Sequence, residues 1–359
     1  MENRIADTPG AASASTAASV AASARDAYYA RIAPSHLAPL WMRLKSLVPA
    51  HPAPDAIAHR WAWDDVRPYL MESASLISAE EAERRVLILE NPGLAGSSRI
   101  AGPLFSGMQL IMPGEVAPAH RHTQSALRFV IEGQGAYTTV DGEPTIMSPG
   151  DFVITPSWTW HHHGNESDAP MVWLDGLDIP LVAHFGATFR EDHHAAKAPV
   201  SRPAGDSLAR YGMGLLPVDY LSPSQNSPVF NYPYARTREA LHVLAKGSDP
   251  DPHQGHLMRY VNPVTGAWAM PTLAAMIRLL PRGFSGRTYR ASDNAVFVGV
   301  EGTSTLTAGG SAFGLHPHDV VVVPGWMPYS LAADDDAVVF TFSDRVAQEK
   351  LGLFREARH

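Results

Sequence analysis

The sequence predicts an all-β core with flanking helices, built as two copies of one β-barrel. The first observation is a run of short β-rich segments, separated by turns, between Gly107 and Asp178. The second is Asp141-Gly142 between two of these segments, a dipeptide typical of a two-residue hairpin turn. The third is that the C-terminal part repeats the spacing of the turn residues. Many short strands at this spacing are typical of sandwiches and barrels.

Length and composition exclude several classes of function. A chain of 359 residues is long enough for two domains with substantial cores. The net charge of −8 provides no basic surface for nucleic acid, and no apolar run is long enough to span a membrane. The chain has no cysteine, which excludes disulfides, thiolate metal sites and a cysteine nucleophile. Imidazole and carboxylate groups remain as metal ligands.

The N-terminal part predicts a tail followed by helices. Residues 1–24 are rich in alanine and serine but lack the basic start and apolar middle of a signal peptide. We therefore expect a disordered tail on a cytoplasmic protein. Residues 25–100 predict a helical segment, with helical spacing of apolar residues over 35–48. A further helix is predicted from Ser78, where Glu81 completes a capping box.

The β-rich parts and the segments between them give the other boundaries. The first barrel contains strands predicted at 109–112, 127–131, 136–140, 152–155 and 171–174. A connector between the barrels contains one plausible helix at 237–244. The predicted regions are the first barrel at 101–192, the connector at 193–255, the second barrel at 256–345 and a C-terminal tail at 346–359.

Three histidines in the first copy are candidate metal ligands. His120 and His122 are two residues apart, so in a strand both imidazoles point to the same face. His161 follows a later strand and can add a third imidazole from a neighbouring strand. Imidazole suits iron, zinc, copper and nickel, so the spacing does not choose the metal. Under the repeat alignment, the second copy holds Tyr289, Ala291 and Tyr329 at these positions. We therefore expect the metal in the first barrel and a structural role for the second.

Both stretches resemble the two motifs of the cupin family. Gly114 to His122 matches Gly-x5-His-x-His, and Gly150 to Asn165 matches Gly-x5-Pro-x-Gly-x2-His-x3-Asn. The one mismatch is Trp158, which replaces the middle glycine of the second motif. The resemblance implies a bicupin, two jelly-roll-like β-barrels in one chain.

The cupin resemblance also bears on the ligand set. It assigns the third ligand position to His161, five residues after Pro156. Cupins commonly place a glutamate ligand a few residues after the second histidine, but this chain has Ala126-Leu127-Arg128 there. The site expected is therefore three histidines with open coordination positions.

A longer part of the chain resembles the gentisate 1,2-dioxygenase family. The strings that carry this resemblance are His120-Arg-His122-Thr-Gln-Ser-Ala-Leu-Arg128, Trp158-Thr-Trp160-His161-His-His163-Gly-Asn165 and Trp173-Leu-Asp175-Gly-Leu-Asp178. The resemblance covers most of the chain and implies an extradiol-type ring-cleaving dioxygenase that depends on Fe(II). Such an enzyme inserts dioxygen between the carboxyl-bearing and the adjacent hydroxyl-bearing carbons of gentisate, giving maleylpyruvate. The resemblance further implies a homo-oligomer, expected to be a tetramer.

Two polar residues are candidates for holding the substrate. Arg128 lies six residues beyond His122, so strand alternation places it on the ligand face, where a guanidinium can meet a carboxylate with two hydrogen bonds. The alternative is that Arg128 pairs with an inward acid. The second copy has Phe297 at this position. Gln109 on the preceding strand can bond the carboxylate or dioxygen, or it can face solvent.

Seven further side chains are assigned from strand alternation and position. His163 shares the face of His161, where it can bond the 5-hydroxyl of gentisate, and His162 is expected to point outward. Asp175 is a candidate partner for His163 or Arg128. Trp158 and Trp160 are expected to pack the barrel instead of contacting substrate. Arg84 and Arg85 can help admit an anion, but they are expected to be surface helix charges.

Three alternatives to gentisate cleavage remain open on the sequence. The first is the same reaction on salicylate or 1-hydroxy-2-naphthoate, whose dioxygenases belong to the same family. The second is a non-catalytic cupin that binds a small acid. Arg128 beside three open-site histidines argues against it, because a storage barrel needs neither. The third is a zinc cupin isomerase, which the missing glutamate ligand disfavours.

Overall fold

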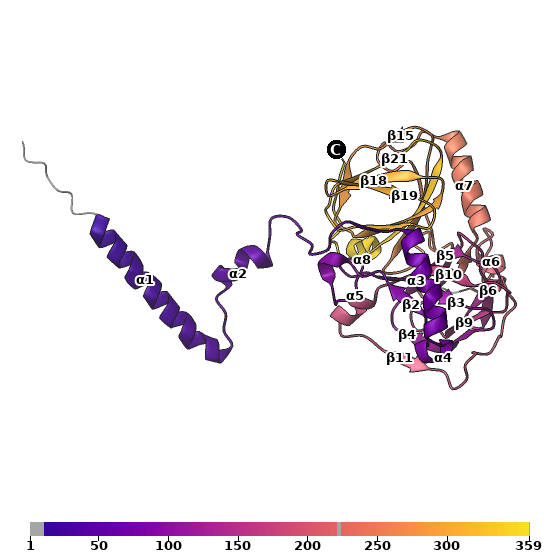
Figure 1. The fold of residues 1–359 in the computed structure, drawn as a ribbon, viewed down its shortest axis with the longest axis horizontal. Coiled ribbons are helices and arrows are strands. Elements are labelled where there is room, and N and C mark those ends of the chain that lie inside the picture. Colours follow the sequence, from indigo (N-terminus) through magenta and orange to yellow (C-terminus); the bar gives the residue numbers. More distant parts are fainter. Residues whose placement is uncertain (1–10, 221–223, 359) are drawn as a thin grey trace, which may run out of the picture. The chain divides into compact units, whose positions relative to one another are not determined.

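The computed structural model describes residues 11–220 and 224–358 and divides into an N-terminal unit up to Ala53 and a main unit from Pro54. The N-terminal unit consists of α1 (Ala11–Ile32), η1 (Ala33–Ser35) and α2 (Leu40–Leu47) (Figure 1). Residues 11–24, expected to be a disordered tail, are helical instead, since alanine has the highest helix propensity. The rest of that expectation, residues 1–10, lies outside the described residues.

The first copy in the main unit consists of two sheets. Their strand orders are β12-β8-β5-β10-β3-β2 and β11-β4-β9-β6-β7. The strands are β2 (Val86–Ile88), β3 (Phe105–Ile111), β4 (Val116–His122), β5 (Ala126–Glu132), β6 (Ala136–Val140), β7 (Glu143–Ile146), β8 (Phe152–Thr155), β9 (His161–Asn165), β10 (Met171–Leu177), β11 (Arg190–Asp192) and β12 (Asn231–Tyr232).

The second copy repeats this arrangement. Its sheets have the orders β1-β20-β17-β22-β14-β13 and β19-β18-β21-β16-β23, with β15 beside β21. The strands are β1 (His59–Trp61), β13 (His256–Arg259), β14 (Ala274–Leu280), β15 (Phe284–Ser285), β16 (Tyr289–Ala291), β17 (Ala295–Glu301), β18 (Ser304–Ala308), β19 (Ser311–Leu315), β20 (Val320–Val323), β21 (Tyr329–Ala333), β22 (Ala337–Ser343) and β23 (Glu356–Arg358).

The strand orders confirm the internal repeat and the all-β core. β8-β5-β10-β3 in the first copy corresponds to β20-β17-β22-β14 in the second, and β4-β9-β6-β7 corresponds to β16-β21-β18-β19. Each copy also has a β-bulge at the equivalent place, near Glu132 in the first and near Glu301 in the second. Among the described residues, the strand pairs of each copy form two separate sheets and do not close into one hydrogen-bonded barrel.

Segments expected to lie outside the barrels add strands to them. From the N-terminal segment, β1 pairs with β20 of the second copy, whereas β2 pairs with β3 of the first. The connector supplies β12, which pairs with β8. The C-terminal tail expected at 346–359 contains β23, which pairs with β16, so it is part of the second copy. These pairings join residues far apart in sequence, which local patterns do not predict.

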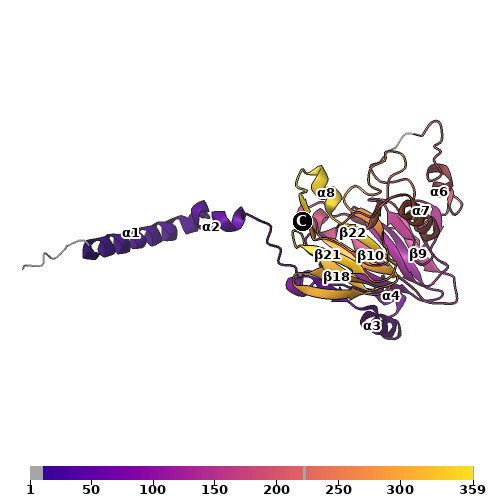
Figure 2. The ribbon, with the colours of Figure 1, turned by 90° about the horizontal axis from the view of Figure 1, so that it is seen from above.

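The helices of the main unit cover its edges (Figure 2). Ser78 caps α4 by accepting a hydrogen bond from the amide of Glu81, as the capping box predicted. The helix predicted at 237–244 is present in α7, which packs on β13 and β14. None of the described helices is both long and apolar enough to cross a membrane. The helices are α3 (Trp63–Leu76), α4 (Ala79–Ala82), η2 (Pro92–Leu94), α5 (Ile179–His184), α6 (Asp206–Tyr211), α7 (Tyr234–Gly247) and α8 (Arg345–Lys350).

A shared hydrophobic core joins the two copies. Alternate residues of β5 and β22 point out of their own copies into this core, where the rings of Phe129 and Phe340 stack with centroids 4.1 Å apart. The intervening residues, such as Arg128 on β5 and Thr341 on β22, point into the interiors of the copies. The same alternation therefore places one face of β5 in the shared core and the other at the candidate site.

We expect Phe129→Ala to destabilise both copies together. Removing a fully buried aromatic ring from a core costs about 3–5 kcal/mol. The free energy of unfolding, measured by urea denaturation, should fall by this amount in a single transition. Phe185→Ala is the matched control, because Phe185 is 63% exposed and its loss should change stability by less than about 0.5 kcal/mol. Two separate transitions, of which only one shifts, would show that the copies do not share a core.

Candidate metal centre and its cavity

Three histidine side chains meet inside the first copy. His120 and His122 project from β4, and His161 projects from the first residue of β9. β4 and β9 are antiparallel, with His120 directly opposite His161. The possible ligand nitrogens all lie within 4.8 Å of one another. The structure thus brings together the three residues that the sequence predicted as a metal site, and no other such cluster occurs in the described part of the chain.

The ring nitrogens of His122 and His161 are arranged as a metal site requires. Nδ1 of His122 lies 2.9 Å from the carbonyl oxygen of Gln124, and Nδ1 of His161 lies 2.9 Å from that of Thr159. A carbonyl only accepts, so we assign the proton of both rings to Nδ1. This leaves Nε2 free to bind a cation. Nε2 of His161 is buried and has no hydrogen-bond partner among the described residues, as expected of an atom that binds a metal.

Electrostatics keeps the three imidazoles neutral. Burial, together with the charge of nearby arginines, lowers the pKa of His120 to about 2 and that of His122 to about 4. Burial, followed by the charge of neighbouring groups, also lowers the pKa of His161 well below its usual value. Neutral imidazole is the form that coordinates metal ions, so near neutral pH all three rings are available as ligands.

The histidines line a cavity of about 180 Å³. A cavity of roughly 150 Å³ can hold benzene, so this one has room for one aromatic ring. Its lining contains three arginines and two acids, together with apolar side chains that can contact a ring. The other lining residues are Glu83, Arg84, Val86, Phe105, Gln109, Arg128, Asp175, Leu177 and Arg190.

Arg128 is the most buried cation of the cavity, with 4% of its surface exposed. Its Nη1 donates to Oγ1 of Thr155 at 2.5 Å, and its Nη2 donates to Nε2 of His163 at 3.2 Å. Its Nε lies 3.5 Å from Oδ1 of Asp175. The guanidinium therefore lines the cavity and also neutralises a buried acid. The pairing with an inward acid is confirmed, whereas the contact with a substrate carboxylate stays a prediction.

Asp175 and His163 hold Arg128 in place. Trp173 donates to Asp175 at 3.0 Å, and burial raises the pKa of Asp175 to about 6 against the opposing charge of Arg128. His163 is fully buried and is absent from the cavity lining. Because its Nε2 accepts from Arg128, its Nδ1 carries the proton and donates to Thr138 at 2.9 Å. Both ring nitrogens are occupied, so the structure does not support the expected bond from His163 to a substrate hydroxyl.

The structure agrees with some of the other predictions about side chains near the site and contradicts others. Gln109 lines the cavity. His162 lies on the opposite face of β9, but it is buried and accepts a hydrogen bond from the amide of Ala198 instead of facing solvent. The expectation that Trp158 and Trp160 pack the barrel interior is wrong. Both rings stack on the Arg121 guanidinium, 4.6 Å away in each case, and the Trp158 ring is 40% exposed.

Two further arginines at the cavity were not among the site residues predicted from the sequence. Arg84, interpreted there as a surface charge, contacts the His120 ring and donates to the carbonyl oxygen of Pro118 at 2.7 Å. Its neighbour Arg85 instead forms a buried ion pair with Glu115. Arg190 reaches the cavity because β11 pairs with β4 and places it opposite His122. No local pattern around Arg190 indicates this pairing.

The fold and the site define a bicupin protein in which three histidines of the described residues form a candidate metal centre. The Cupin domain family model matches residues 107–177. Gentisate 1,2 dioxygenase 1 from Aquipseudomonas alcaligenes is 51% identical over 335 residues, covering 93% of this chain and 96% of the relative. The chain belongs to the gentisate 1,2-dioxygenase family of ring-cleaving dioxygenases, as the sequence resemblance indicated.

Other members of this family are named for different substrates. 5-aminosalicylate 1,2-dioxygenase from a Comamonas species is 35% identical over 92% of this chain and 89% of its own. A crystal structure of a salicylate 1,2-dioxygenase variant from Pseudoaminobacter salicylatoxidans in complex with gentisate superposes with a TM-score of 0.88. It is 34% identical and covers 93% of this chain and 94% of its own. The family therefore contains enzymes for several ortho-hydroxybenzoates.

Proposed function

We propose that the protein is an Fe(II)-dependent dioxygenase that cleaves gentisate between its carboxyl-bearing carbon and the adjacent hydroxyl-bearing carbon, giving maleylpyruvate. The observation that carries this proposal is a cluster of three neutral histidines beside a buried arginine, in a cavity that fits one aromatic ring. The relative that is 51% identical supports gentisate as the substrate.

His120, His122 and His161 would hold the iron, which would supply the redox chemistry that reaction with dioxygen requires. Three neutral ligands would leave the double positive charge of Fe(II) uncompensated, and this favours an anionic substrate. An ortho-hydroxybenzoate offers a carboxylate and an adjacent hydroxyl oxygen to such a centre. The protein's own contribution is to bind and orient this substrate.

The polar residues of the cavity provide that orientation. Arg128 has N–H groups beyond those bonded to Thr155 and His163, and these can donate to the substrate carboxylate. Asp175 keeps the guanidinium charged and in place. Gln109 offers an amide for the carboxylate or for dioxygen. Arg84 and Arg190, which also line the cavity, raise the local concentration of an anionic substrate.

The size of the cavity bears on the alternative substrates. A volume of about 180 Å³ suits a single ring better than the fused rings of 1-hydroxy-2-naphthoate. Gentisate and salicylate differ only by the 5-hydroxyl, and both would use the same carboxylate contact. Salicylate is therefore the second candidate substrate. A non-catalytic acid-binding cupin is disfavoured because His161 keeps an unpartnered, buried Nε2.

Oxygen uptake tests the proposed function directly. The protein is reconstituted with iron(II) without air, and gentisate, salicylate and 1-hydroxy-2-naphthoate are then supplied in parallel with dioxygen. We expect one mole of dioxygen consumed per mole of gentisate, with a ring-cleaved product and a higher kcat/KM than for the other two acids. Binding of gentisate without oxygen uptake by the iron-loaded protein would instead indicate a storage function.

His163→Ala should lower turnover without removing the metal. The substitution frees Arg128 from one of its partners, and misplacement of a group that orients the substrate lowers catalysis. Gentisate and salicylate should lose kcat/KM by similar factors, roughly 10- to 100-fold, because both rely on the carboxylate contact. His162→Ala is the control. A loss confined to gentisate would instead place His163 at the 5-hydroxyl, as the sequence analysis expected.

The expected tetramer and the cytoplasmic location remain proposals. Large apolar side chains of α2 are exposed within the chain, which is typical of surfaces that pack on another subunit. They belong to Leu40, Trp41, Met42, Leu44 and Leu47.

A further inference from the structure

The second copy contains a cavity of its own at the place that corresponds to the metal site. Tyr289 and Tyr329, the counterparts of His120 and His161, lie opposite each other in register as the histidines do. Both tyrosines line a cavity of about 50 Å³. Arg278, which stands at the position of Gln109, lines it as well. The metal ligands are thus replaced, but a polar interior remains.

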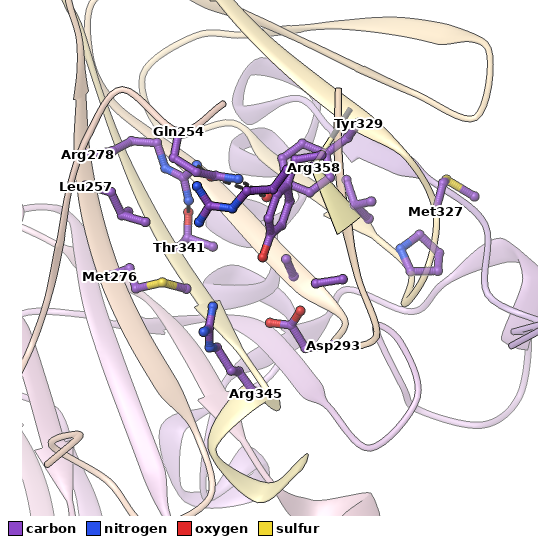
Figure 3. Close-up of a pocket in the computed structure, with 15 residues that line it drawn as sticks. Gln254, Leu257, Met276, Arg278, Asp293, Met327, Tyr329, Thr341, Arg345 and Arg358 are labelled. Atoms are coloured by element: carbon purple, nitrogen blue, oxygen red, sulfur yellow. Dashed lines mark hydrogen bonds between the residues drawn. The ribbon is translucent and has the colours of Figure 1, made fainter. Parts of the chain in front are cut away.

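Arg278 is a buried cation without an acidic partner. It is 1% exposed, and within the described residues it forms no ion pair. It donates to the neutral acceptors Thr341, at 3.1 Å, and Gln254 (Figure 3). Its Nε is buried with no hydrogen-bond partner. A buried charge is strongly unfavourable unless an opposite charge accompanies it, so this arrangement favours an anion beside Arg278.

Comparison with the first copy shows which acid is missing from the second copy. There, Arg128 is the buried arginine, and Asp175 of β10 neutralises it. The strand pairings place Phe297 at the position of Arg128 and Thr341 at the position of Asp175. The second copy therefore has a buried arginine on a neighbouring strand, whereas the acid has been replaced by a neutral residue.

The other charges of the cavity are largely paired. Figure 3 shows Arg345 and Arg358 converging on the same space as Arg278. Arg345 is bound to Glu349 at 2.7 Å, and Arg358 is bound to Asp251 at 2.8 Å and to Glu356 at 3.5 Å. Asp293 is the one acid in the lining, and burial together with the charge of Asp344 raises its pKa to about 6. Acids outside the lining therefore neutralise Arg345 and Arg358, whereas Arg278 has no ion pair within the described residues.

We propose that this cavity binds a small planar oxyanion on the guanidinium of Arg278. The oxyanion is either bicarbonate or a short carboxylate such as acetate. A water molecule needs about 10–15 Å³ of such space, so about 50 Å³ holds roughly three to five non-hydrogen atoms. Acetate and bicarbonate have this size, whereas an aromatic acid is too large. The planar fork of an arginine matches the two oxygens of such an anion.

The test is the unfolding temperature of the metal-loaded protein as a function of anion concentration, at constant ionic strength. Acetate, bicarbonate and the neutral isostere acetamide are the probes, and benzoate is the size control. A ligand that binds only the native state raises this temperature in a saturable manner. We expect saturable stabilisation by acetate, bicarbonate or both, and none by acetamide. Comparing acetate with bicarbonate identifies which of the two anions the site prefers.

Variants assign the effect to this cavity. Arg278→Gln should weaken the apparent affinity for the anion at least tenfold. Arg282→Gln, at an arginine with an 82% exposed side chain just beyond β14, should leave it unchanged. The metal cavity is intact in both variants, so anion binding there cannot produce a difference. If Arg278→Gln does not fold, Arg278→Lys, which keeps the charge and loses the fork, serves in its place. Equal anion effects in wild type and variant, or no saturable effect in wild type, would overturn the proposal.

Discussion

Replacing His161 with alanine should remove the metal and lower ring cleavage by at least about a thousandfold. A bound metal ion contributes several kcal/mol to transition-state stabilisation, and each 1.36 kcal/mol corresponds to a factor of ten in rate. His161 supplies one of only three ligand nitrogens, and the described residues offer no fourth histidine or acid to the cluster. We expect the same result for His120→Ala and His122→Ala.

Metal analysis separates a lost ligand from a damaged fold. The alanine variants should contain almost no iron after reconstitution, whereas the wild type should contain about one ion per chain. Tyr329→Phe is the matched control for metal content, since Tyr329 occupies the position of His161 in the second copy. It should keep its iron. Full iron occupancy in His161→Ala would remove His161 from the ligand set, whatever the activity of that variant.

Replacing Arg128 with glutamine should lower both activity and stability, for different reasons. Loss of a hydrogen bond to a charged group costs about 1.5–3 kcal/mol, which corresponds to roughly a 10- to 150-fold lower kcat/KM for gentisate. Removing one partner of a buried ion pair costs about 3–5 kcal/mol of stability, because Asp175 remains buried and unpaired. Iron content should not change.

A double variant distinguishes the two effects. In Arg128→Gln/Asp175→Asn no uncompensated charge remains, so stability should recover while activity stays low. Arg128→Lys should recover part of the activity, since lysine keeps the charge but not the planar fork. Urea unfolding and gentisate kinetics on the three proteins measure both quantities. Near-normal kinetics in a folded, iron-loaded Arg128→Gln protein would exclude Arg128 as the substrate anchor.

The stability of Arg128→Gln should also depend on pH. The pKa of Asp175 is already raised from 3.8 to about 6 in the native protein, and without the arginine charge it rises further. A carboxyl group whose pKa is higher in the folded than in the unfolded protein stabilises the fold most when the pH lies below its unfolded pKa. This contribution is lost as the pH rises through the folded pKa. Relative to the wild type, the variant should therefore be less destabilised at pH 5 than at pH 8.

The features predicted correctly from sequence depend on short stretches of chain. Asp141 and Gly142 both adopt positive φ angles, 47° and 79°, and join β6 to β7 as the hairpin prediction required. His120 and His122 share a face because strand side chains alternate. Alternation also placed Arg128 correctly on the ligand face. Each of these predictions needs only a few neighbouring residues.

Errors and omissions occurred where a residue's partner comes from a distant segment. The surroundings of Trp158 depend on Arg121, and His162 is buried next to Ala198 of the connector. Arg84 and Arg190 belong to the cavity only because segments on both sides of the first copy pack against β4. The sequence also could not show that both ring nitrogens of His163 are hydrogen-bonded within the protein. The face predicted for His163 was correct, but its two hydrogen-bond partners were not known.

By itself the sequence determined the class of fold, the repeat, the loss of the metal ligands in the second copy and the three histidines of the first. These properties follow from turn geometry, strand alternation and spacing, which act over a few residues. Only the tertiary structure decided which charges face the cavity, which polar groups are already occupied, and that Arg278 is buried with no acidic partner among the residues described. These properties depend on burial and pairing between strands from remote parts of the chain, and local spacing carries no information about them.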